Sequence, residues 1–533
     1  MTGVSLAGDR TVARVALIKP FTGLNLGVSQ LSGELIRAGH ESLVVYFKDF
    51  LVVPAEEGGR YLRTDYGLTN VGARGQEHLW NCYRPVTERE YELLFEELER
   101  FAPELIGFSL TSLSMKLAAE VTARIKQRFD VPVIWGGVGP TLQPEWALEH
   151  ADMVCVNEGE ELLIELAERL DDGADYSDLQ DLWLKKDGRI VKNPGRPLVE
   201  LEKVAIPDFD PVRIVHINDD QLRRDFYPLW AGTQYPIMTQ RGCPFSCSFC
   251  VESVYQDMFG KKNSLRRRSV DVTIAELVEA KRKYRIPQVM FYDDVFTVNP
   301  RWLREFAPRY KREVGLPFWC YTYPTTTRKE DILLLKDAGL HSITMGIQSG
   351  SEEILANDFN RPVSQRKAIE AAQTLVECGV ETYFDLITKV HFEKEDDCRK
   401  TFDFLLELPR ELKTVGFAEM VSFPKYGYTD KVNGEGASVT LSDRDYAYYH
   451  KLYFLTRTNL PRRVVKMMGN SRLVRRFPSL IDPMLPKQLP FFFLLEKNDP
   501  YATEALNTPI GQAVIPGGRL DRGAPPAEVQ ARL

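Results

Sequence analysis

The sequence predicts an α/β protein with three parts: an amino-terminal doubly wound parallel sheet, a central partial (β/α)6 barrel and a mostly helical carboxy-terminal region. Short β-branched runs alternate with longer runs of helical periodicity, first over about 13–170 and again over about 236–421. A chain of 533 residues also exceeds what one hydrophobic core usually supports. We therefore expect several domains, two of them with parallel strands.

The first alternation predicts the amino-terminal sheet. Strands are expected at 13–18, 43–47, 105–109, 131–135 and 153–156, and helices at 26–38, 88–101, 115–129 and 160–170. Because strand, helix and strand repeat in this order, the sheet should be parallel, and ligands bind beyond the carboxyl ends of such strands. The loops at those ends are rich in Gly, Ser, Thr and Pro and lie at 19–26, 110–114, 136–141 and 157–160.

The second alternation predicts the barrel. Strands are expected at 236–239, 288–292, 318–321, 342–346, 382–387 and 415–421, with helical patterns between them. Six such β/α units indicate a partial barrel, whose catalytic groups should lie at the carboxyl ends of its strands.

These patterns divide the chain into five segments. They are a sheet domain at 10–175, a partly structured linker at 176–225, the partial barrel at 226–428, a helical region at 429–515 and an unstructured tail at 516–533. The tail is rich in Gly, Pro and Arg. The helix-spaced tyrosines of the helical region either line a pocket or belong to its core, and they are Tyr446, Tyr448, Tyr449 and Tyr453.

The composition excludes several classes of protein. A net charge of −7 gives no broad positive field for nucleic acid. Eight cysteines are too few for a secreted disulfide framework, and residues 1–20 lack the pattern of an export signal. Apolar runs such as 491–495 fall far short of the roughly 20 residues that cross a bilayer. We therefore expect a cytoplasmic protein without a membrane span and without a nucleic-acid partner.

Three cysteines crowd into the loop after the first barrel strand. Cys243, Cys247 and Cys250 stand at i, i+4 and i+7, and the next cysteine is Cys320, on a predicted strand. Three thiolates can bind three irons of a cubane cluster and leave the fourth iron open, whereas structural zinc and structural clusters take four protein ligands. The alternative is a zinc knuckle or three unrelated thiols.

The triad, with Phe249 before its last cysteine, resembles the signature of the radical S-adenosylmethionine (SAM) superfamily. The resemblance implies a 4Fe-4S cluster whose open iron binds the amino and carboxylate groups of SAM. It also implies SAM-binding roles for Phe249, for Asp293 and Asp294 after the second barrel strand, and for Gln348 and Ser349 after the fourth. The bland alternative for the aspartates is a cap of the helix expected at 300–310.

Two departures and one charge run accompany this resemblance. Many relatives have Glu where this chain has Gln348, and 388–391 stands where relatives often show Gly-Pro-Gly. The run Arg266-Arg267-Arg268 is either a solvated face or a contact to the carboxylate of SAM or of a second cofactor.

The sequence at 134–141 and 156–161 resembles the amino-terminal domain of cobalamin-binding radical SAM proteins, a Rossmann-like sheet, and the full likeness covers roughly 13–425. Glycines after a strand let a bulky ligand approach backbone amides, although Gly136-Gly137 can also be only a tight turn. No Asp-x-His-x-x-Gly motif is present to supply a histidine to cobalt. The resemblance implies cobalamin-binding roles for Thr22, Asn25, Leu26, Ser109, Thr111, Ser112, Gly136, Gly137, Gly139, Glu158, Gly159 and Glu160.

The resemblance implies a cobalamin-dependent radical SAM methyltransferase. It would methylate an unactivated carbon of a small molecule through methylcobalamin and a 5'-deoxyadenosyl radical, and it would need an external one-electron reductant of the flavodoxin or ferredoxin type. One alternative is an oxidative cyclase or rearrangement enzyme resembling the anaerobic magnesium-protoporphyrin ester cyclase, and another is a corrinoid carrier or sensor. A methylthiotransferase would carry a second cysteine triad where this chain has only Cys82 and Cys155. The pattern assigns no acid or base catalyst.

Overall fold

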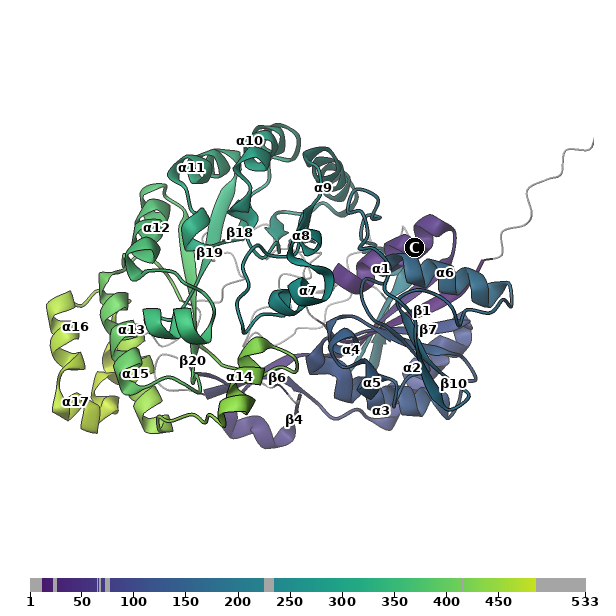
Figure 1. Cartoon of the computed structure of the whole chain (residues 1–533), viewed down its shortest axis with the longest axis horizontal. Helices are drawn as coiled ribbons and strands as arrows, with labels where there is room; N and C mark the ends of the chain where they lie inside the picture. The colour runs from purple at the N-terminus through teal and green to yellow at the C-terminus, as the bar shows by residue number, and fades with distance from the viewer. Residues whose placement is uncertain are drawn as a thin grey trace, which may run out of the picture. The chain divides into compact units, whose positions relative to one another are not determined.

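The computed structural model describes residues 12–485 apart from 23–25, 65, 67–68, 72–76, 225–233 and 415–416. Asn25, the side chain of Thr22 and the predicted tail lie outside the described residues. The chain forms two compact units (Figure 1). The N-terminal unit comprises Met1–Val52, Glu57–Gly67 and Trp80–Pro228, and the barrel unit comprises Val53–Glu56, Leu68–Leu79 and Leu229–Leu533.

The N-terminal unit is built on a doubly wound sheet whose strands run in the order β11-β10-β9-β8-β7-β1-β2-β12-β13. Its parallel strands are β1 (Arg14–Thr22), β2 (Glu41–Asp49), β7 (Leu105–Ser109), β8 (Val133–Gly136), β9 (Met153–Cys155) and β12 (Ile214–Asn218). The direction of winding reverses between β1 and β7, which is where sheets of this kind bind ligands. The predicted fold class is confirmed for this part of the chain.

Helices cover both faces of this sheet because its central strands are apolar on both sides. Val15 and Leu17 of β1 pack with α1 (Leu26–Ala38) and α6 (Glu160–Asp171), and Ile18 packs with α2 (Glu88–Phe101) and α3 (Met115–Lys126) on the other face. Strands that are buried on both faces are typical of parallel sheets.

Segment 176–225, expected as a linker, lies within the N-terminal unit. It forms β10 (Leu182–Lys186) and β11 (Arg189–Lys192) at one edge of the sheet and β12 and β13 (Gln221–Arg223) at the other. The strands that flank the parallel core are short antiparallel additions, apart from β12. This segment therefore holds the two edges of the sheet.

The described residues of the barrel unit form a partial barrel of six parallel strands, as predicted. They are β14 (Tyr235–Ile237), β17 (Val289–Phe291), β18 (Phe318–Thr322), β19 (Leu340–Gln348), β20 (Glu381–Thr388) and β21 (Phe417–Glu419). The outer helices follow the strands in an arc in Figure 1 and are α9 (Val270–Tyr284), α10 (Pro300–Arg309), α11 (Lys329–Ala338), α12 (Gln365–Glu377) and α13 (Glu395–Glu407). Beyond β21 the sheet continues antiparallel into β5 (Thr69–Val71), a strand that the sequence did not predict.

Side chains alternate between two environments along the barrel strands. The residues that face the outer helices are fully buried. Examples are Phe291, Cys320, Met345 and Phe384. Their neighbours face the concave inner side and keep partial exposure, and these are Tyr292, Tyr321, Gly346, Gln348, Asp385 and Ile387. The inner side of this half-barrel therefore carries several partly exposed polar side chains.

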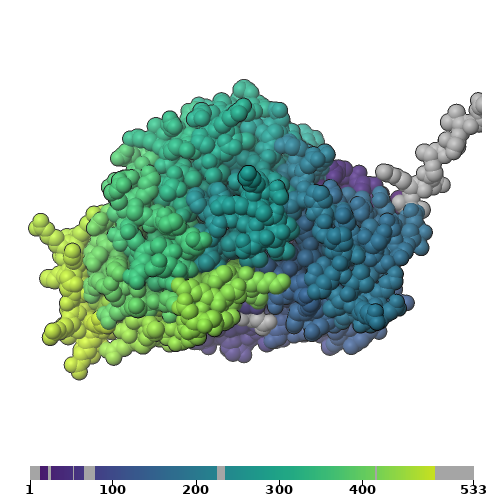
Figure 2. All heavy atoms as spheres, viewed as in Figure 1, coloured from purple at the N-terminus to yellow at the C-terminus, as the bar shows by residue number. Residues whose placement is uncertain are grey.

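The carboxy-terminal region is helical as far as the structure describes it. Its helices are α14 (Gly427–Glu435), α15 (Asp443–Leu455), α16 (Arg462–Gly469) and α17 (Arg472–Arg476). Figure 2 shows α16 and α17 in yellow beside the green barrel helices, and α15 packs on α13. Tyr448 donates to the Gly469 carbonyl at 2.8 Å and Tyr453 to that of Cys398 at 3.0 Å, so these tyrosines belong to the core. No helix among the described residues is long and apolar enough to cross a bilayer.

Candidate functional site

The three cysteines lie in one loop between β15 (Gln240–Arg241) and α7 (Val251–Phe259). Cys243 and Cys247 are buried and Cys250 is half-buried. Gly242 begins the loop with a φ of +87°, and a Cβ there would lie 2.2 Å from the Ser264 carbonyl oxygen. Only glycine fits this position. The tight turn at Gly242 therefore sets the position of the next residue, Cys243.

Side chains from α7 hold the cysteine loop in shape. The Gln256 amide donates to the carbonyls of Cys243 at 2.6 Å and Phe245 at 2.9 Å, and accepts from the Ser246 hydroxyl at 2.6 Å. Phe249 meets Phe359 edge to ring at 4.8 Å. The loop is thus braced on both sides, with its three thiols on a single rigid segment.

The two predicted aspartates have different roles because they alternate in direction. Asp293 is fully buried and accepts from the backbone nitrogens of Thr239 at 2.6 Å and Gln240 at 3.1 Å. It thereby anchors the strand that leads into the cysteine loop. Asp294 lies on the inner side, beside Cys243 and Cys250, and its Oδ2 has no hydrogen-bond partner among the described residues.

Two positions of the arginine run do not form a solvated face. Arg267 pairs with Asp293 at 3.0 Å, and its guanidinium lies 4.4 Å from the centre of the Trp302 ring. Arg268 pairs with Glu276 at 2.5 Å. Both arginines are buried. The expectation of a solvated face is therefore wrong at these two positions, because both side chains pair with internal carboxylates. A contact of the run with the carboxylate of SAM or of a second cofactor stays a prediction.

Two buried carboxyl groups border the thiols without a full set of partners. Glu252 follows Cys250 by two residues, and its Oε2, like Oδ2 of Asp294, has no hydrogen-bond partner among the described residues. Burial, then the charge of Asp294, raises the pKa of Glu252 to about 8. Burial, then the charge of Asp293, raises the pKa of Asp294 to about 6. A cationic ammonium group of a ligand would satisfy both oxygens.

The three thiols lie on one loop, and three thiolates can bind three irons of a cubane cluster. Within the described residues, no group of three or more His, Cys, Asp or Glu side chains is arranged to hold a single metal ion. Burial raises the pKa of Cys243 to about 12, and a bound metal would reverse that shift by stabilising the thiolate.

Arg361 belongs to the site although no sequence pattern marks it. Its Nη1 donates to Sγ of Cys247 at 3.6 Å, and its Nη2 donates to the Gly346 carbonyl at 2.5 Å. The guanidinium lies 4.0 Å from the centre of the Tyr323 ring, and that ring stacks on Phe245 at 3.8 Å. A buried arginine in this position stabilises negative charge on the sulfur.

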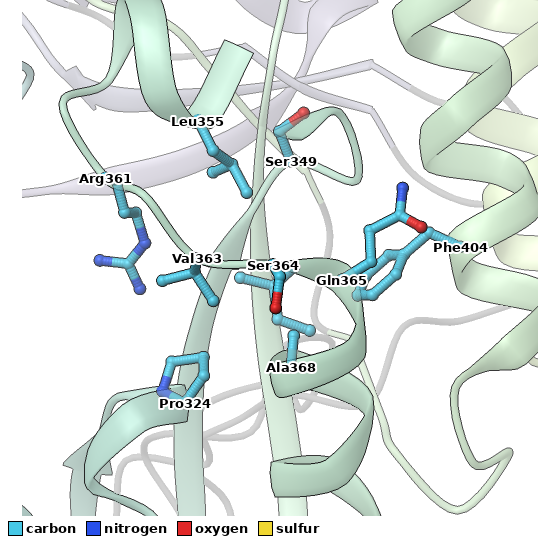
Figure 3. A pocket seen from close by; sticks show the side chains of 10 residues that line it. Pro324, Ser349, Leu355, Arg361, Val363, Ser364, Gln365, Ala368 and Phe404 are labelled. Atoms are coloured by element: carbon cyan, nitrogen blue, oxygen red, sulfur yellow. The ribbon is translucent and has the colours of Figure 1, made fainter. Parts of the chain in front are cut away.

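Gln348 and Ser349 separate at the end of β19. Gln348 has a φ of +73° at a register shift and stays on the inner side. Ser349 is buried and its hydroxyl accepts from the Ser351 nitrogen at 3.1 Å. Figure 3 shows Ser349 in a small pocket with Arg361 and Gln365, at the outside of the turn that follows the strand.

In the N-terminal unit, two of the predicted glycines allow the loop after β8 to lie directly against the loop after β7. A Cβ at Gly137 would lie 2.4 Å from the Leu110 carbonyl oxygen, and φ there is +100°. A Cβ at Gly139 would lie 2.9 Å from the carbonyl carbon of Thr111. The loops after β7 and β8 therefore touch through these glycines, which explains them without a ligand. Gly136 has only an ordinary contact with Cys155.

The carboxyl ends of β1 and β7 meet through Lys19, a residue that no sequence pattern marks. Lys19 is buried near the end of β1, and its Nζ donates to the Ser109 carbonyl at 3.2 Å. Burial lowers the pKa of Lys19 to about 8. Thr111 caps the short turn at Ser112–Ser114, and Ser112 is buried in it. These groups share the edge of the sheet where winding reverses.

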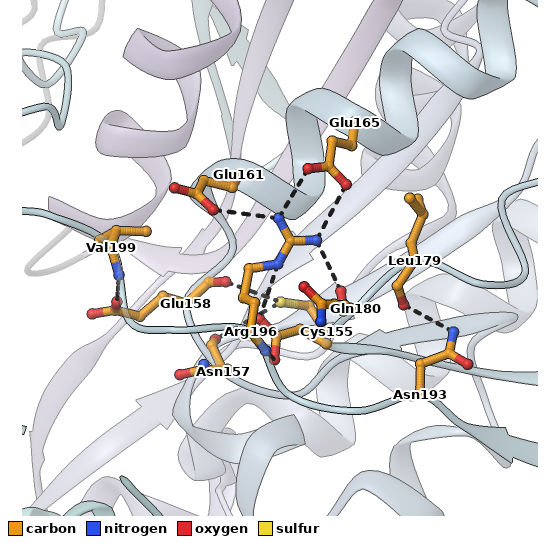
Figure 4. A network of polar contacts seen from close by, with 11 residues as sticks. Cys155, Asn157, Glu158, Glu161, Glu165, Leu179, Gln180, Asn193, Arg196 and Val199 are labelled. Atoms are coloured by element: carbon orange, nitrogen blue, oxygen red, sulfur yellow. Dashed lines mark hydrogen bonds and ion pairs between the residues drawn. The ribbon is translucent and has the colours of Figure 1, made fainter. Parts of the chain in front are cut away.

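Glu158 faces the edge segment of the sheet. It accepts from the Val199 nitrogen at 2.9 Å. Beside it, the buried guanidinium of Arg196 lies 3.3 Å from Glu165 and 3.2 Å from Asp181, as Figure 4 shows for the network around Arg196. This loop is therefore neutralised internally. Of the remaining predicted residues, Leu26 begins α1, Gly159 precedes α6 with ordinary contacts, and Glu160 is buried at the start of α6.

Family models match both units of the chain. The radical SAM superfamily matches residues 237–405, and the B12 binding domain matches residues 62–167. The chain therefore contains a radical SAM domain and a B12-binding domain.

Individual relatives agree with this assignment. An uncharacterised methyltransferase of Pyrococcus horikoshii is 29% identical over 58% of this chain and 66% of its own length. The anaerobic magnesium-protoporphyrin IX monomethyl ester cyclase of Rubrivivax gelatinosus is 21% identical over 58% of this chain and 55% of its own length. The chain thus spans between about half and two thirds of these relatives.

A solved structure shares the fold. The radical SAM methyltransferase TsrM of Kitasatospora setae, solved with cobalamin and a [4Fe-4S] cluster, has a TM-score of 0.58 at 18% identity, covering 80% of this chain and 75% of that one. The likeness confirms the arrangement of a doubly wound sheet, a half-barrel and a helical region within one chain.

Proposed function

We propose that this chain is a cobalamin-dependent radical SAM enzyme that methylates an unactivated carbon of a small molecule. The observation that carries the proposal is the single braced loop with three thiols, which lies beside the unsatisfied oxygens of Asp294 and Glu252. When bound, the cluster with SAM supplies one-electron chemistry and cobalamin carries the methyl group.

The chain's own residues would hold these groups. Cys243, Cys247 and Cys250 bind three irons, and Arg361 donates to the thiolate of Cys247. Asp294 and Glu252 accept hydrogen bonds from the ammonium of SAM. Asp293 holds the backbone of Thr239 and Gln240, which leads into the cysteine loop. The inner side of the half-barrel would keep water from the reacting carbon.

Phe249, Gln348 and Ser349 complete the proposed SAM site. Phe249 packs behind the loop, and Gln348 faces the ribose from the inner side. Ser349 shapes the turn after β19, because its hydroxyl accepts from Ser351.

Cobalamin would occupy the carboxyl edge of the N-terminal sheet. Thr22, Asn25 and Leu26 border it on one side, and the remaining groups are Ser109, Thr111, Ser112, Gly136, Gly137, Gly139, Glu158, Gly159 and Glu160. In this proposal the glycines and Glu158 act by fixing loops.

The proposal includes an external one-electron donor of the flavodoxin or ferredoxin type and a reducing, cytoplasmic setting. All eight cysteines are free, as a reducing compartment would keep them.

The test is anaerobic reconstitution followed by analysis of cofactors and products. We expect about four irons per chain, bound corrinoid, and a product heavier than its substrate by one methyl group in place of one hydrogen. A corrinoid carrier would bind cobalamin without consuming SAM in the presence of a reductant, and that result would refute an enzymatic role.

A second candidate is an oxidative cyclase, which the similarity to the Rubrivivax gelatinosus cyclase favours. Both activities would use the same cofactor-binding residues. Product mass separates them, because cyclisation removes hydrogen and methylation adds carbon.

A further inference from the structure

Two polar side chains on the inner side of the half-barrel have no role in the proposed cofactor site. They are Asp385 of β20 and Tyr321 of β18. In the parallel register Tyr321 lies opposite Thr344 of β19, and Asp385 lies opposite Gly346, one inward position further along. Alternate residues of a strand share a face, so both side chains point into the same concave surface.

The arrangement leaves both groups without protein partners. Among the described residues, none forms a hydrogen bond or ion pair with the Asp385 carboxylate, and burial alone raises its pKa to about 6. Burial, and then the charge of Asp385, raises the pKa of Tyr321. The neighbouring Tyr292 hydroxyl is likewise buried with no hydrogen-bond partner among the described residues.

Such a cluster is costly unless a ligand completes it. A largely desolvated carboxylate without a cation or donors destabilises the fold, and proteins keep such groups chiefly where they bind something. Asp385 lies beside Gly346 in the strand register, and the charge of Asp294 acts on Tyr321, so the pair borders the proposed cofactor site without belonging to the residues assigned to it. The missing partner is a positive charge or a strong hydrogen-bond donor.

The surroundings of Asp385 also limit what can reach it. Ile387, the next inward residue of β20, packs against an apolar cluster around Phe359, and Phe249 and Met420 pack against the same cluster. A Cβ at Gly346 would lie 3.2 Å from Nη2 of Arg361, so the arginine beside Cys247 borders the same surface. A ligand bound here therefore contacts apolar side chains near the cysteine loop and the polar groups of Asp385 and Tyr321 further from it.

We propose that Asp385 and Tyr321 form the recognition site for the substrate, and that the substrate carries a protonated amine on an apolar body. This inference rests on the proposed function and names its substrate class. The ammonium pairs with Asp385, Tyr321 adds a hydrogen bond, and the apolar body lies against Ile387 and Met420, closer to the cysteine loop.

A matched pair of probes tests this inference without knowledge of the substrate. Benzylamine and benzyl alcohol share a ring and differ in charge, and their binding to the anaerobically reconstituted full chain can be followed by ligand-observed NMR. We expect benzylamine to bind about tenfold more tightly, and we expect the preference to vanish in Asp385→Asn. Asp430→Asn, at an exposed position of α14, is the control that keeps the preference.

Three outcomes of this experiment would overturn the inference that Asp385 recognises the substrate. Equal binding of the two probes, or a preference that survives Asp385→Asn, overturns the inference. A fall in SAM affinity that matches the fall in benzylamine affinity would place Asp385 in the SAM site and overturn it as well. Asp385→Asn should melt no lower than the wild type, because it removes an unpaired buried charge. Probe binding needs no SAM chemistry, so failure of the proposed function would appear separately, as a cluster signal that ignores SAM.

Discussion

The two units place their candidate sites at the same kind of sheet edge but treat charge in opposite ways. In the barrel unit, the half-buried Asp294, Glu252 and Asp385 have raised pKa values, and Asp294 and Glu252 each have one oxygen without a hydrogen-bond partner among the described residues. In the N-terminal unit, Arg196 and Glu158 are satisfied by their own chain. The barrel site thus keeps carboxyl oxygens that a charged ligand would satisfy, whereas the loops at the N-terminal edge are held by their own chain.

Loss of one thiol should have the largest effect and should affect only the barrel. Cys247→Ala removes an iron ligand together with the acceptor of the Arg361 hydrogen bond. We expect iron content to fall by at least half while corrinoid binding stays unchanged, as measured by iron analysis and corrinoid absorbance. Cys378→Ala, at a buried cysteine outside the loop, is the matched control. Equal iron content in both variants would contradict the proposed site.

A change at Gly137 should weaken corrinoid binding in the N-terminal unit and leave the cluster unchanged. In Gly137→Ala the new Cβ meets the Leu110 carbonyl at a strained φ of +100°, which should cost about 2–4 kcal/mol and separate the two loops. Corrinoid binding should weaken at least tenfold while the cluster signal remains. Gly173→Ala, also at positive φ but with open space around it, controls for backbone strain alone. If both variants bind corrinoid equally, the contact between the loops does not matter.

Removal of Arg361 should change the cluster without abolishing it. Arg361→Gln takes away the positive charge near Cys247, so the reduced, more negative cluster is less stabilised and the reduction potential should fall. Arg366→Gln, on the exposed face of α12, should leave the potential where it is. Redox titration followed by EPR makes the measurement, and an unchanged potential would show that Arg361 is only a structural brace.

The smallest effects concern pH and have opposite signs in the two units. Asp385 has a raised pKa of about 6, so the folded state binds the extra proton and stability falls as pH rises from about 4 to 6. Lys19 has a lowered pKa of about 8, so the unfolded state binds the extra proton and stability rises from about pH 8 to 10.5.

Thermal melting of variants checks both slopes. Asp385→Asn should raise the melting temperature at pH 7 and give no gain at pH 4, and Lys19→Met should raise it at pH 7 and lose that gain above pH 10. The expected size is about 1–3 kcal/mol each. A gain that does not vary with pH would mean that packing, and not charge, causes the change.

The sequence predicted the strands and the cysteine loop because both have short-range patterns. Alternation of β-branched runs with helical periods located all six barrel strands within a few residues. It could not tell Asp293 from Asp294, because their difference depends on which one faces the helices. Glu252 and Arg361 were missed for a related reason: their importance comes from burial beside the thiols, and neither belongs to a repeated pattern.

The sheet edges and the glycines show a second limit. Segment 176–225 has turn signals that fit a linker, yet its strands pair with β9 and β2, which are distant in sequence. Gly137 and Gly139 were interpreted through a ligand, whereas tertiary contact between two loops already demands them. Local sequence cannot distinguish a glycine that admits a ligand from one that admits a neighbouring backbone.

Low-temperature EPR of the reconstituted, dithionite-reduced full chain, recorded before and after addition of SAM, shows whether one iron is open to SAM. We expect a [4Fe-4S] signal that shifts when SAM coordinates the iron that no cysteine occupies. A spectrum that SAM leaves unchanged, in a preparation loaded with about four irons per chain, would contradict this expectation.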